Sequence, residues 1–334
     1  MFSTRKTATE YNIVRDCARG ERIFRKVLRE NSVFFVENAF SGCLLVLEMV
    51  VCPPDMSRNK RKKKQADRKA GALLFAEWQK ERLERDCDFP EPAPGPSEVT
   101  VVTHFAPGGS DRAAAAVRLE CALRETWRNC GFLRAVVVAD AESPELSAFA
   151  SSFGGRVEIR VEPSIRSGRA ADVAAFRAAR LPDLFRTGWV LVVSEDAFPV
   201  RPGLGSYIDR FDFVGAPHPL SDAWLPRAAA SLFGVRAMDG AFSLRTRSLC
   251  LRVAAAWNAR MAGRPVPADF SDGLFATSFL PSRSLAYRRA VRLPSFGEAL
   301  RFARRSASAV SPGNVPFGFS GVDAFVPLAK AGLV

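Results

Sequence analysis

Short β-branched segments alternate with helix-like segments along the C-terminal two-thirds of the chain, and this alternation is the strongest constraint on its fold. Residues 99–103 form a short β-branched run, and residues 189–193 form the most hydrophobic candidate strand. Between them Leu119, Leu123 and Trp127 recur at every fourth position, which places them on one face of a helix. Further strands are expected at residues 134–140, 157–161 and 212–215, and further helices at 170–180 and 249–261. The pattern predicts an α/β domain with a mostly parallel sheet and helices on both of its faces.

A proline-rich run separates this pattern from a different N-terminal region. Residues 89–96 contain four prolines, which exclude a helix or a central strand and indicate a stiff linker. We therefore expect an N-terminal extension at residues 1–97, a folded domain at 98–325 and a C-terminal tail at 326–334. The extension is expected to be partly helical, over about residues 67–85, or disordered.

Positive charge is concentrated in the extension. The formal net charge is +13, and residues 58–69 hold eight basic side chains and one acidic one. A solvated run is the expected state of such a segment, and binding to nucleic acid or anionic lipid is the alternative. The run has no aromatic residues between its charges, so it is not suited to stacking on bases.

An apolar stretch at residues 32–53 leaves two locations open. The stretch contains Glu37, Asn38 and Glu48, and a carboxylate in the middle of a membrane-spanning helix is costly. A cytoplasmic protein is therefore expected, with membrane association through residues 32–53 as the alternative. The seven cysteines are odd in number and include no C-x-x-C pair, which agrees with free thiols in a reducing compartment.

Two adjacent carboxylates follow the most hydrophobic strand directly. Glu195 and Asp196 come just after residues 189–193, and ligands of α/β proteins bind beyond the carboxyl ends of such strands. A carboxylate in this position can hold Mg²⁺ or Mn²⁺ against a diphosphate. A turn or helix cap is an equally simple interpretation. The chain has only two histidines, His104 and His218, which excludes a metal site built from several histidines.

Two further segments combine carboxylates with glycine or arginine. In the first, Asp239 and Gly240 precede Arg245. Glycine lets the backbone approach a ligand closely, and arginine can bind phosphate through two parallel hydrogen bonds. The alternative is a turn into an edge strand. In the second, Asp272 is a candidate general base toward an acceptor hydroxyl, or a cap of the helix that follows.

Five segments of the chain occur in an order typical of one known family. They read SEDAF at residues 194–198, DFVGAP at 212–217, DGAFSLRTR at 239–247, SDGLF at 271–275 and FGFSG at 317–321. Over about two-thirds of its length the chain thus resembles a domain-of-unknown-function family with the GT-A glycosyltransferase fold. The resemblance implies a GT-A-like, Rossmann-like sheet and a site for a nucleotide-diphospho-sugar at its carboxyl edge.

The same resemblance implies roles for individual residues. Asp196 would hold the metal ion, and Asp272 would act on the acceptor. The donor side of the site would be formed by Glu195, Gly215, Asp239, Gly240 and Arg245.

The chain departs from the family pattern at the metal site. Ser320 stands where the family usually has histidine, Asp239 replaces an asparagine and Ala241 replaces a second glycine. A hydroxyl is a poor substitute for imidazole on Mn²⁺, so a divalent cation would be held by Asp196, the diphosphate and water. The expected function is transfer of a sugar from a nucleotide-sugar donor to a hydroxyl acceptor, such as a glycan. The alternative is an inactive module that binds a nucleotide sugar or a glycan.

Overall fold

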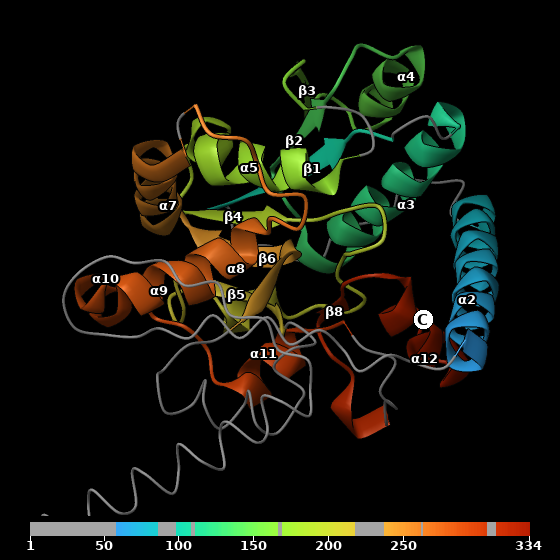
Figure 1. Ribbon diagram of the computed structural model, residues 1–334. Helices are drawn as coiled ribbons and strands as arrows, with labels where there is room; N and C mark the ends of the chain where they lie inside the picture. The colour runs from blue at the N-terminus through green and yellow to red at the C-terminus, as the bar shows by residue number, and fades with distance from the viewer. Residues whose placement is uncertain are drawn as a thin grey trace, which may run out of the picture. The chain divides into compact units, whose positions relative to one another are not determined.

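Six strands form one mixed, mostly parallel sheet in the order β3-β2-β1-β4-β6-β5 (Figure 1). The computed structural model describes residues 58–85, 98–107, 111–165, 169–217, 237–261, 263–305 and 312–334. The strands are β1 (Val99–Phe105), β2 (Arg134–Ala139), β3 (Val157–Val161), β4 (Trp189–Val192), β5 (Phe213–Pro217) and β6 (Met238–Thr246). β1 pairs in parallel with β2 and β4, and β2 with β3, whereas β6 runs antiparallel to both β4 and β5.

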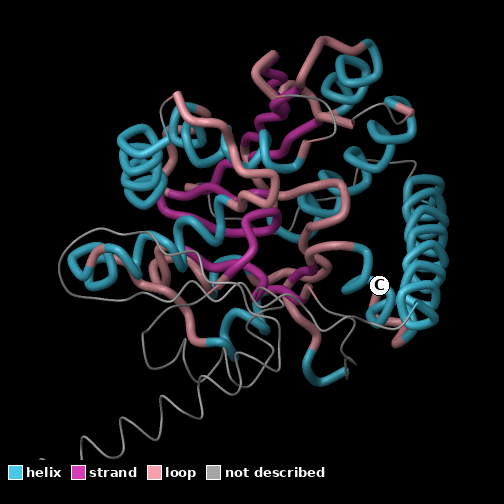
Figure 2. The backbone as a smooth tube through the Cα atoms, viewed as in Figure 1, coloured by secondary structure: helices cyan, strands magenta, loops and turns pink. Residues whose placement is uncertain are grey.

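Helices cover both faces of the sheet, as Figure 2 shows by colour. The longer helices are α2 (Arg58–Arg85), α3 (Arg112–Cys130), α4 (Pro144–Ser152), α5 (Ala170–Arg180), α7 (Arg247–Met261) and α12 (Val322–Lys330). The shorter ones are α8 (Asp272–Leu274), α9 (Leu280–Arg283), α10 (Leu285–Ala290) and α11 (Phe296–Phe302). A π-helical turn, Phe275–Phe279, joins α8 to α9, and 3-10 turns lie at Leu181–Asp183, Leu204–Ser206 and Pro312–Asn314.

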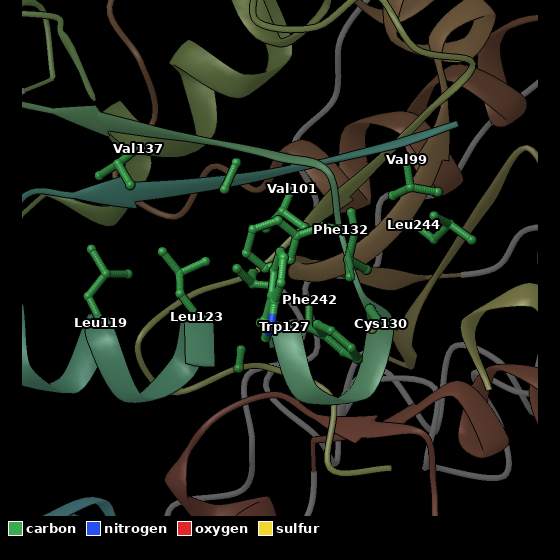
Figure 3. Packing of buried hydrophobic residues seen from close by; sticks show 14 of the residues in the cluster. Val99, Val101, Leu119, Leu123, Trp127, Cys130, Phe132, Val137, Phe242 and Leu244 are labelled. Atoms are coloured by element: carbon green, nitrogen blue, oxygen red, sulfur yellow. The ribbon is translucent and has the colours of Figure 1, made fainter. Parts of the chain in front are cut away.

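The two faces of the sheet are set by alternation along the strands. Val101 of β1 packs with Leu119, Leu123 and Trp127 of α3, as Figure 3 shows. Val102, the next residue of β1, packs on the opposite face of the sheet in a cluster that includes Phe176 of α5. The predicted mostly parallel α/β sheet with helices on both faces is therefore confirmed, as is the predicted apolar face of α3.

A short parallel pair of strands lies outside the main sheet. β7 (Ala303–Arg304) pairs with β8 (Gly318–Phe319). The amide of Ser320 donates to the carbonyl of Arg304 at 2.8 Å, which extends the pairing by one residue. This pairing holds the segment that leads into α12 beside the segment that follows α11.

Helix α2 belongs in part to the folded domain, although the sequence assigned it to the extension. One compact unit comprises residues Arg68–Val334. Within it Phe75 is 3% exposed, and its ring lies 4.7 Å from the ring of Phe325 and 6.2 Å from that of Phe198. Figure 1 shows α2 beside α12. The apolar residues of α2 thus complete a core that the α/β pattern does not reveal.

The C-terminal residues are also part of the domain. Helix α12 continues to Lys330 and its Leu328 is fully buried, so the segment that the sequence set apart as a C-terminal tail, residues 326–334, includes the last part of this helix. None of the helices in the described ranges is both long and apolar enough to cross a membrane. The apolar stretch at residues 32–53 lies outside those ranges.

Candidate functional site

The topology of the sheet points to the carboxyl ends of β1 and β4 as the candidate ligand site. The chain adds β2 and β3 on one side of β1 and then returns to add β4 on the other side. Neighbouring parallel strands whose connections leave in opposite directions open a crevice at their carboxyl ends. The segment that leaves β4 at this point is the one that carries Glu195 and Asp196.

A tight turn presents these two carboxylates. Ser194 and Ala197 bond to each other through both backbone groups, at 2.9 and 3.1 Å, so Glu195 and Asp196 occupy the tip. The Ser194 hydroxyl donates to the carbonyl of Ala241 at 3.2 Å, which ties the turn to β6. The carbonyl of Asp196 accepts from the amide of Gly321 at 2.9 Å. Three of the five sequence segments therefore meet at this turn.

Asp196 lies among other acids. Burial, followed by the carboxylates of Glu195 and Asp239, raises the pKa of Asp196 to about 6. No side-chain hydrogen bond to its carboxylate occurs within the described ranges. We refer to Glu195, Asp196 and Asp239 as the acidic cluster.

Asp239 is the most constrained member of the acidic cluster. Its Oδ2 accepts a hydrogen bond from the Ser320 hydroxyl at 2.6 Å, and its Oδ1 lies 3.2 Å from Nη1 of Arg305. The Ala241 amide also donates to Oδ1, at 3.4 Å. Asp239 is 7% exposed. Sequence reasoning brought Asp239 and Ser320 to the same site, but it did not include Arg305.

Glu195 is held from a part of the chain that sequence reasoning set aside. Its carboxylate accepts from Nε of Arg118 on α3 at 3.0 Å, and its carbonyl accepts from Nε2 of Gln79 on α2 at 3.1 Å. Gln79 is only 1% exposed. Phe75 and Gln79 lie four positions apart on one face of α2, and the apolar Phe75 and Trp78 within this charged helix are the sequence signal that could have indicated a packed face.

Asp272 lies in a different environment from the one expected of a general base. It is fully buried, and its Oδ1 accepts from Nη2 and Nε of Arg177 at 2.8 and 3.1 Å. Its Oδ2 accepts from Nη2 of Arg245 at 2.5 Å. Burial alone would raise the pKa of Asp272, but the two guanidinium groups outweigh it and hold that pKa well below its usual range. We refer to Asp272, Arg177 and Arg245 as the buried ion network.

Arg245 faces the interior rather than a phosphate. Besides Asp272, it donates to the carbonyl of Gly240 at 3.1 Å and to the Ser243 hydroxyl at 3.0 Å. Its guanidinium carbon lies 4.9 Å from the centre of the Phe213 ring, and the residue is 2% exposed. The donors of the Arg245 side chain are thus directed into the protein, and its contact with a phosphate stays a prediction.

The predicted donor-loop glycines have packing roles. A Cβ atom added at Gly240 would lie 2.5 Å from Oδ1 of Asp272, and one added at Gly215 would lie 2.5 Å from the carbonyl oxygen of Asp239. Both distances are shorter than a carbon–oxygen contact permits. These glycines let β5, β6 and α8 approach one another, and so they position Asp239 and Asp272.

His104 is the one described histidine, and it lies at the carboxyl end of β1. Its ring packs edge-on against Phe176 at 5.9 Å. Burial first, and then the Arg177 guanidinium, lower the pKa of His104 well below its ordinary value. His104 is therefore a neutral, packed residue.

The side chains of the acidic cluster do not fit a divalent metal site. No group of three or more His, Cys, Asp or Glu side chains in the described ranges is placed to hold a metal ion. Both oxygens of Asp239 are already engaged by Arg305 and Ser320, and Glu195 is paired with Arg118. Asp196 alone is left for a cation, so these side chains do not form a resident metal site by themselves, and an ion bound through this one carboxylate would need a diphosphate and water as its other ligands.

Residues 181–320 match the family described as "Protein of unknown function (DUF5672)". The matched range contains the acidic cluster, Ser320, Arg305, Arg245 and Asp272, whereas Gln79, Arg118 and Arg177 lie outside it. No curated protein matches the chain.

Three solved structures are similar to the chain at low identity. "Mannosyltransferase PcManGT from Pyrobaculum calidifontis in complex with GDP-Man and Mn2+" has 15% identity and a TM-score of 0.33, over 64% of this chain and 60% of that one. "X-ray structure of the mannosyltransferase Ktr4p from S. cerevisiae" has 10% identity and a TM-score of 0.37, over 69% and 77%. "Crystal Structure of a Mycobacterial Protein" has 13% identity and a TM-score of 0.32, over 49% and 62%. Similarity at this level does not transfer an activity.

Proposed function

We propose that this protein binds a nucleotide-sugar donor at the acidic cluster and transfers the sugar to a hydroxyl acceptor. The observation that carries the proposal is the convergence of Asp196, Asp239 and Ser320, from three separate segments, at the carboxyl end of β4. This is the edge of an α/β sheet at which nucleotides bind. A carboxylate with no side-chain partner beside a partly exposed arginine supplies both a proton acceptor and a cation.

The transfer requires one bond to break and one to form. The bond between the anomeric carbon and the diphosphate oxygen breaks, and its electron pair leaves with the diphosphate. A bond from the acceptor oxygen to the anomeric carbon forms, and the hydroxyl proton passes to a carboxylate. We assign that carboxylate to Asp196, because Asp272 is fully buried and bound by Arg177 and Arg245.

A binding module without turnover is the second candidate. The observation that favours it is the position of Asp272, the acid expected to act on the acceptor, inside the buried ion network. If Asp196 does not act as the base, the site retains the means to bind a donor but not to activate an acceptor.

Calorimetry with the full chain tests the donor site. Nucleoside diphosphates and nucleotide sugars would be titrated into wild type, Asp196→Ala and the control Asp183→Ala, whose side chain is 56% exposed and pairs with Arg180 outside the acidic cluster. The full chain is required because the compact unit begins at Arg68. Release of nucleoside diphosphate in the presence of hydroxyl acceptors would report transfer.

The outcomes separate the two candidate functions. Donor binding with release of nucleoside diphosphate that Asp196→Ala abolishes supports the transferase. Donor binding without release supports the binding module. If no nucleotide or nucleotide sugar binds, the proposed function is wrong in both forms.

The basic run at residues 58–69 supports a separate, weaker proposal. Its residues lie in the N-terminal part of α2, which has no acidic residue in its first turn. A helix with such a charge excess would bind nucleic acid or anionic lipid in a salt-dependent manner. Retention of the wild-type chain on vesicles containing phosphatidylserine, or on duplex DNA, at 50 but not 500 mM salt would support it.

A further inference from the structure

The acidic cluster has a cation beside it, the guanidinium of Arg305. Nη1 of Arg305 lies 3.2 Å from Oδ1 of Asp239, and the Arg305 side chain is 36% exposed while that of Asp239 is 10% exposed. Arg305 also acts on Asp196, since its charge is among those that oppose the rise in the pKa of that acid. The Arg305 guanidinium is thus paired with Asp239 and lies near enough to Asp196 to act on its charge.

The backbone fixes where Arg305 stands. It directly follows β7, and β7 pairs with β8, which leads into Ser320. The bond from the Ser320 amide to the Arg304 carbonyl closes this pair at 2.8 Å. Arg305 and Ser320 are therefore brought to opposite oxygens of Asp239 by the same two short strands, so the arrangement is built into the fold.

A divalent cation would have to replace these contacts. To bind Asp239 it would displace either the Arg305 guanidinium from Oδ1 or the Ser320 hydroxyl from Oδ2. Two positive charges on one carboxylate group also repel each other. The structure therefore places a permanent cation on Asp239, whereas the resemblance assigned the metal ion to the neighbouring acid Asp196.

The chemistry of the guanidinium suits a diphosphate. Arginine carries five N–H donors, and the contact with Asp239 uses one side of the group. The remaining donors can form parallel hydrogen bonds with phosphate oxygens, for which the planar group is well matched. A cation anchored by a carboxylate keeps its position while negative charge develops on a leaving group.

We propose that Arg305, held by Asp239, binds the diphosphate of the donor in place of a divalent metal ion. The inference rests on the proposed function for the identity of the donor, and it predicts a donor site that works without metal. Ser320 then has a positioning role: its hydroxyl fixes Asp239, and Asp239 fixes Arg305.

Metal-free calorimetry on the full chain tests the inference. GDP, UDP and inorganic pyrophosphate would be titrated in excess EDTA and again with Mn²⁺, against wild type, Arg305→Ala and Arg305→Lys. Arg301→Ala is the matched control, because it removes an exposed arginine from the same segment. Thermal unfolding of each variant would establish that it is folded.

The expected result is binding in EDTA that Mn²⁺ does not strengthen. Arg305→Ala should weaken it by about tenfold or more, the size of one lost charge-assisted contact, whereas Arg301→Ala should not change it. Arg305→Lys should recover part of the affinity, because it keeps the charge and loses the planar group. If Arg305 had only a structural role, its variants would lower the melting temperature, but Arg305→Lys would not bind more tightly than Arg305→Ala.

Other results would overturn the inference in distinguishable ways. Binding that requires Mn²⁺ and survives Arg305→Ala refutes the role of Arg305 but keeps the proposed donor site. Pyrophosphate binding that depends on Arg305, with no nucleotide binding, keeps the role of Arg305 and refutes the nucleotide-sugar function. Absence of binding by every probe refutes both.

Discussion

Two groups of carboxylates and arginines lie within the domain, and they differ in how completely their charges are paired. In the buried ion network one carboxylate, Asp272, is bound by two arginines, and all three side chains are at most 9% exposed. In the acidic cluster Asp239 is paired with one arginine, Arg305, which is 36% exposed, and the Asp196 carboxylate has no side-chain hydrogen bond in the described part of the chain. The same residue types thus form a closed structural unit in one place and an open site in the other.

The two clusters shift the pKa of their acids in opposite directions. Burial acts on both Asp272 and Asp196. For Asp272 the two guanidinium groups outweigh burial and lower the pKa, whereas for Asp196 the neighbouring acids add to burial and raise it. An acid whose charge is fully compensated stabilises a fold, and an acid whose charge is not compensated is available to a ligand or a proton.

Removal of Asp272 should have the largest effect on stability. Asp272→Ala leaves the buried guanidinium groups of Arg177 and Arg245 without their partner, and a broken buried pair costs about 3–5 kcal/mol. Urea denaturation would measure the loss, with the exposed Asp269→Ala as the control. A stable Asp272→Ala protein that has lost only transfer would show that Asp272 is a catalytic residue after all, and would remove the contrast between the clusters.

The pH dependence of stability should identify the same carboxylate. Because the folded-state pKa of Asp272 is lowered, its contribution is present above the unfolded value of about 3.9 and is lost as pH falls through the folded value. Acid should therefore destabilise wild type more steeply than Asp272→Asn below about pH 4. Equal acid sensitivity in the two proteins would contradict the assignment.

The packing of α2 behind the acidic cluster should have the next largest effect. Phe75 contacts Phe198, which lies two residues after Asp196, and Phe319, which precedes Ser320. Phe75→Ala should cost about 3–5 kcal/mol, whereas Leu73→Ala on the exposed side of the helix, where the residue is 67% exposed, should cost little. Equally small losses of stability in both variants, measured by urea denaturation, would show that α2 is not packed on the domain and belongs to the extension.

Neutralising Asp196 should stabilise the protein, in contrast to the loss at Asp272. The pKa of Asp196 is raised to about 6, so its ionisation destabilises the fold as pH rises from about 4 to 6. Asp196→Asn should gain at most about 3 kcal/mol at pH 8 and nothing at pH 4. Thermal unfolding at the two pH values measures this. A loss of stability at pH 8 would mean that neighbouring groups balance the negative charge of Asp196 as fully as they balance that of Asp272.

The smallest expected effect is local and concerns Gln79. Its Nε2, on α2, donates a hydrogen bond to the Glu195 carbonyl at 3.1 Å. Gln79→Ala should increase hydrogen exchange in peptides covering residues 194–198 by about tenfold, the equivalent of about 1.4 kcal/mol, and leave β1 unchanged. Glu77→Ala, an exposed change on the same helix, is the control. Unchanged exchange would show that the turn is held by its own hydrogen bonds alone.

Much of the fold could be predicted from the sequence, because it depends on local periodicity. Residues 157–161 and 170–180 form β3 and α5 with the predicted bounds, and Leu119, Leu123 and Trp127 occupy one buried face of α3. The acidic pair after β4 could also be predicted, since a sheet of this class places the end of a central strand at its ligand edge. These features need only the spacing of apolar residues and the order of strands.

The role of each charged residue depended on tertiary structure. Arg177 and Asp272 are 95 positions apart in the chain, and Ser320 and Asp239 are 81 positions apart. No local pattern states that Arg245 would turn inward to Asp272, or that Arg305 would reach Asp239. The sequence determined which acids and arginines the domain possesses, but a charge is paired by the nearest opposite charge in space, and only the folded chain decides which residue that is.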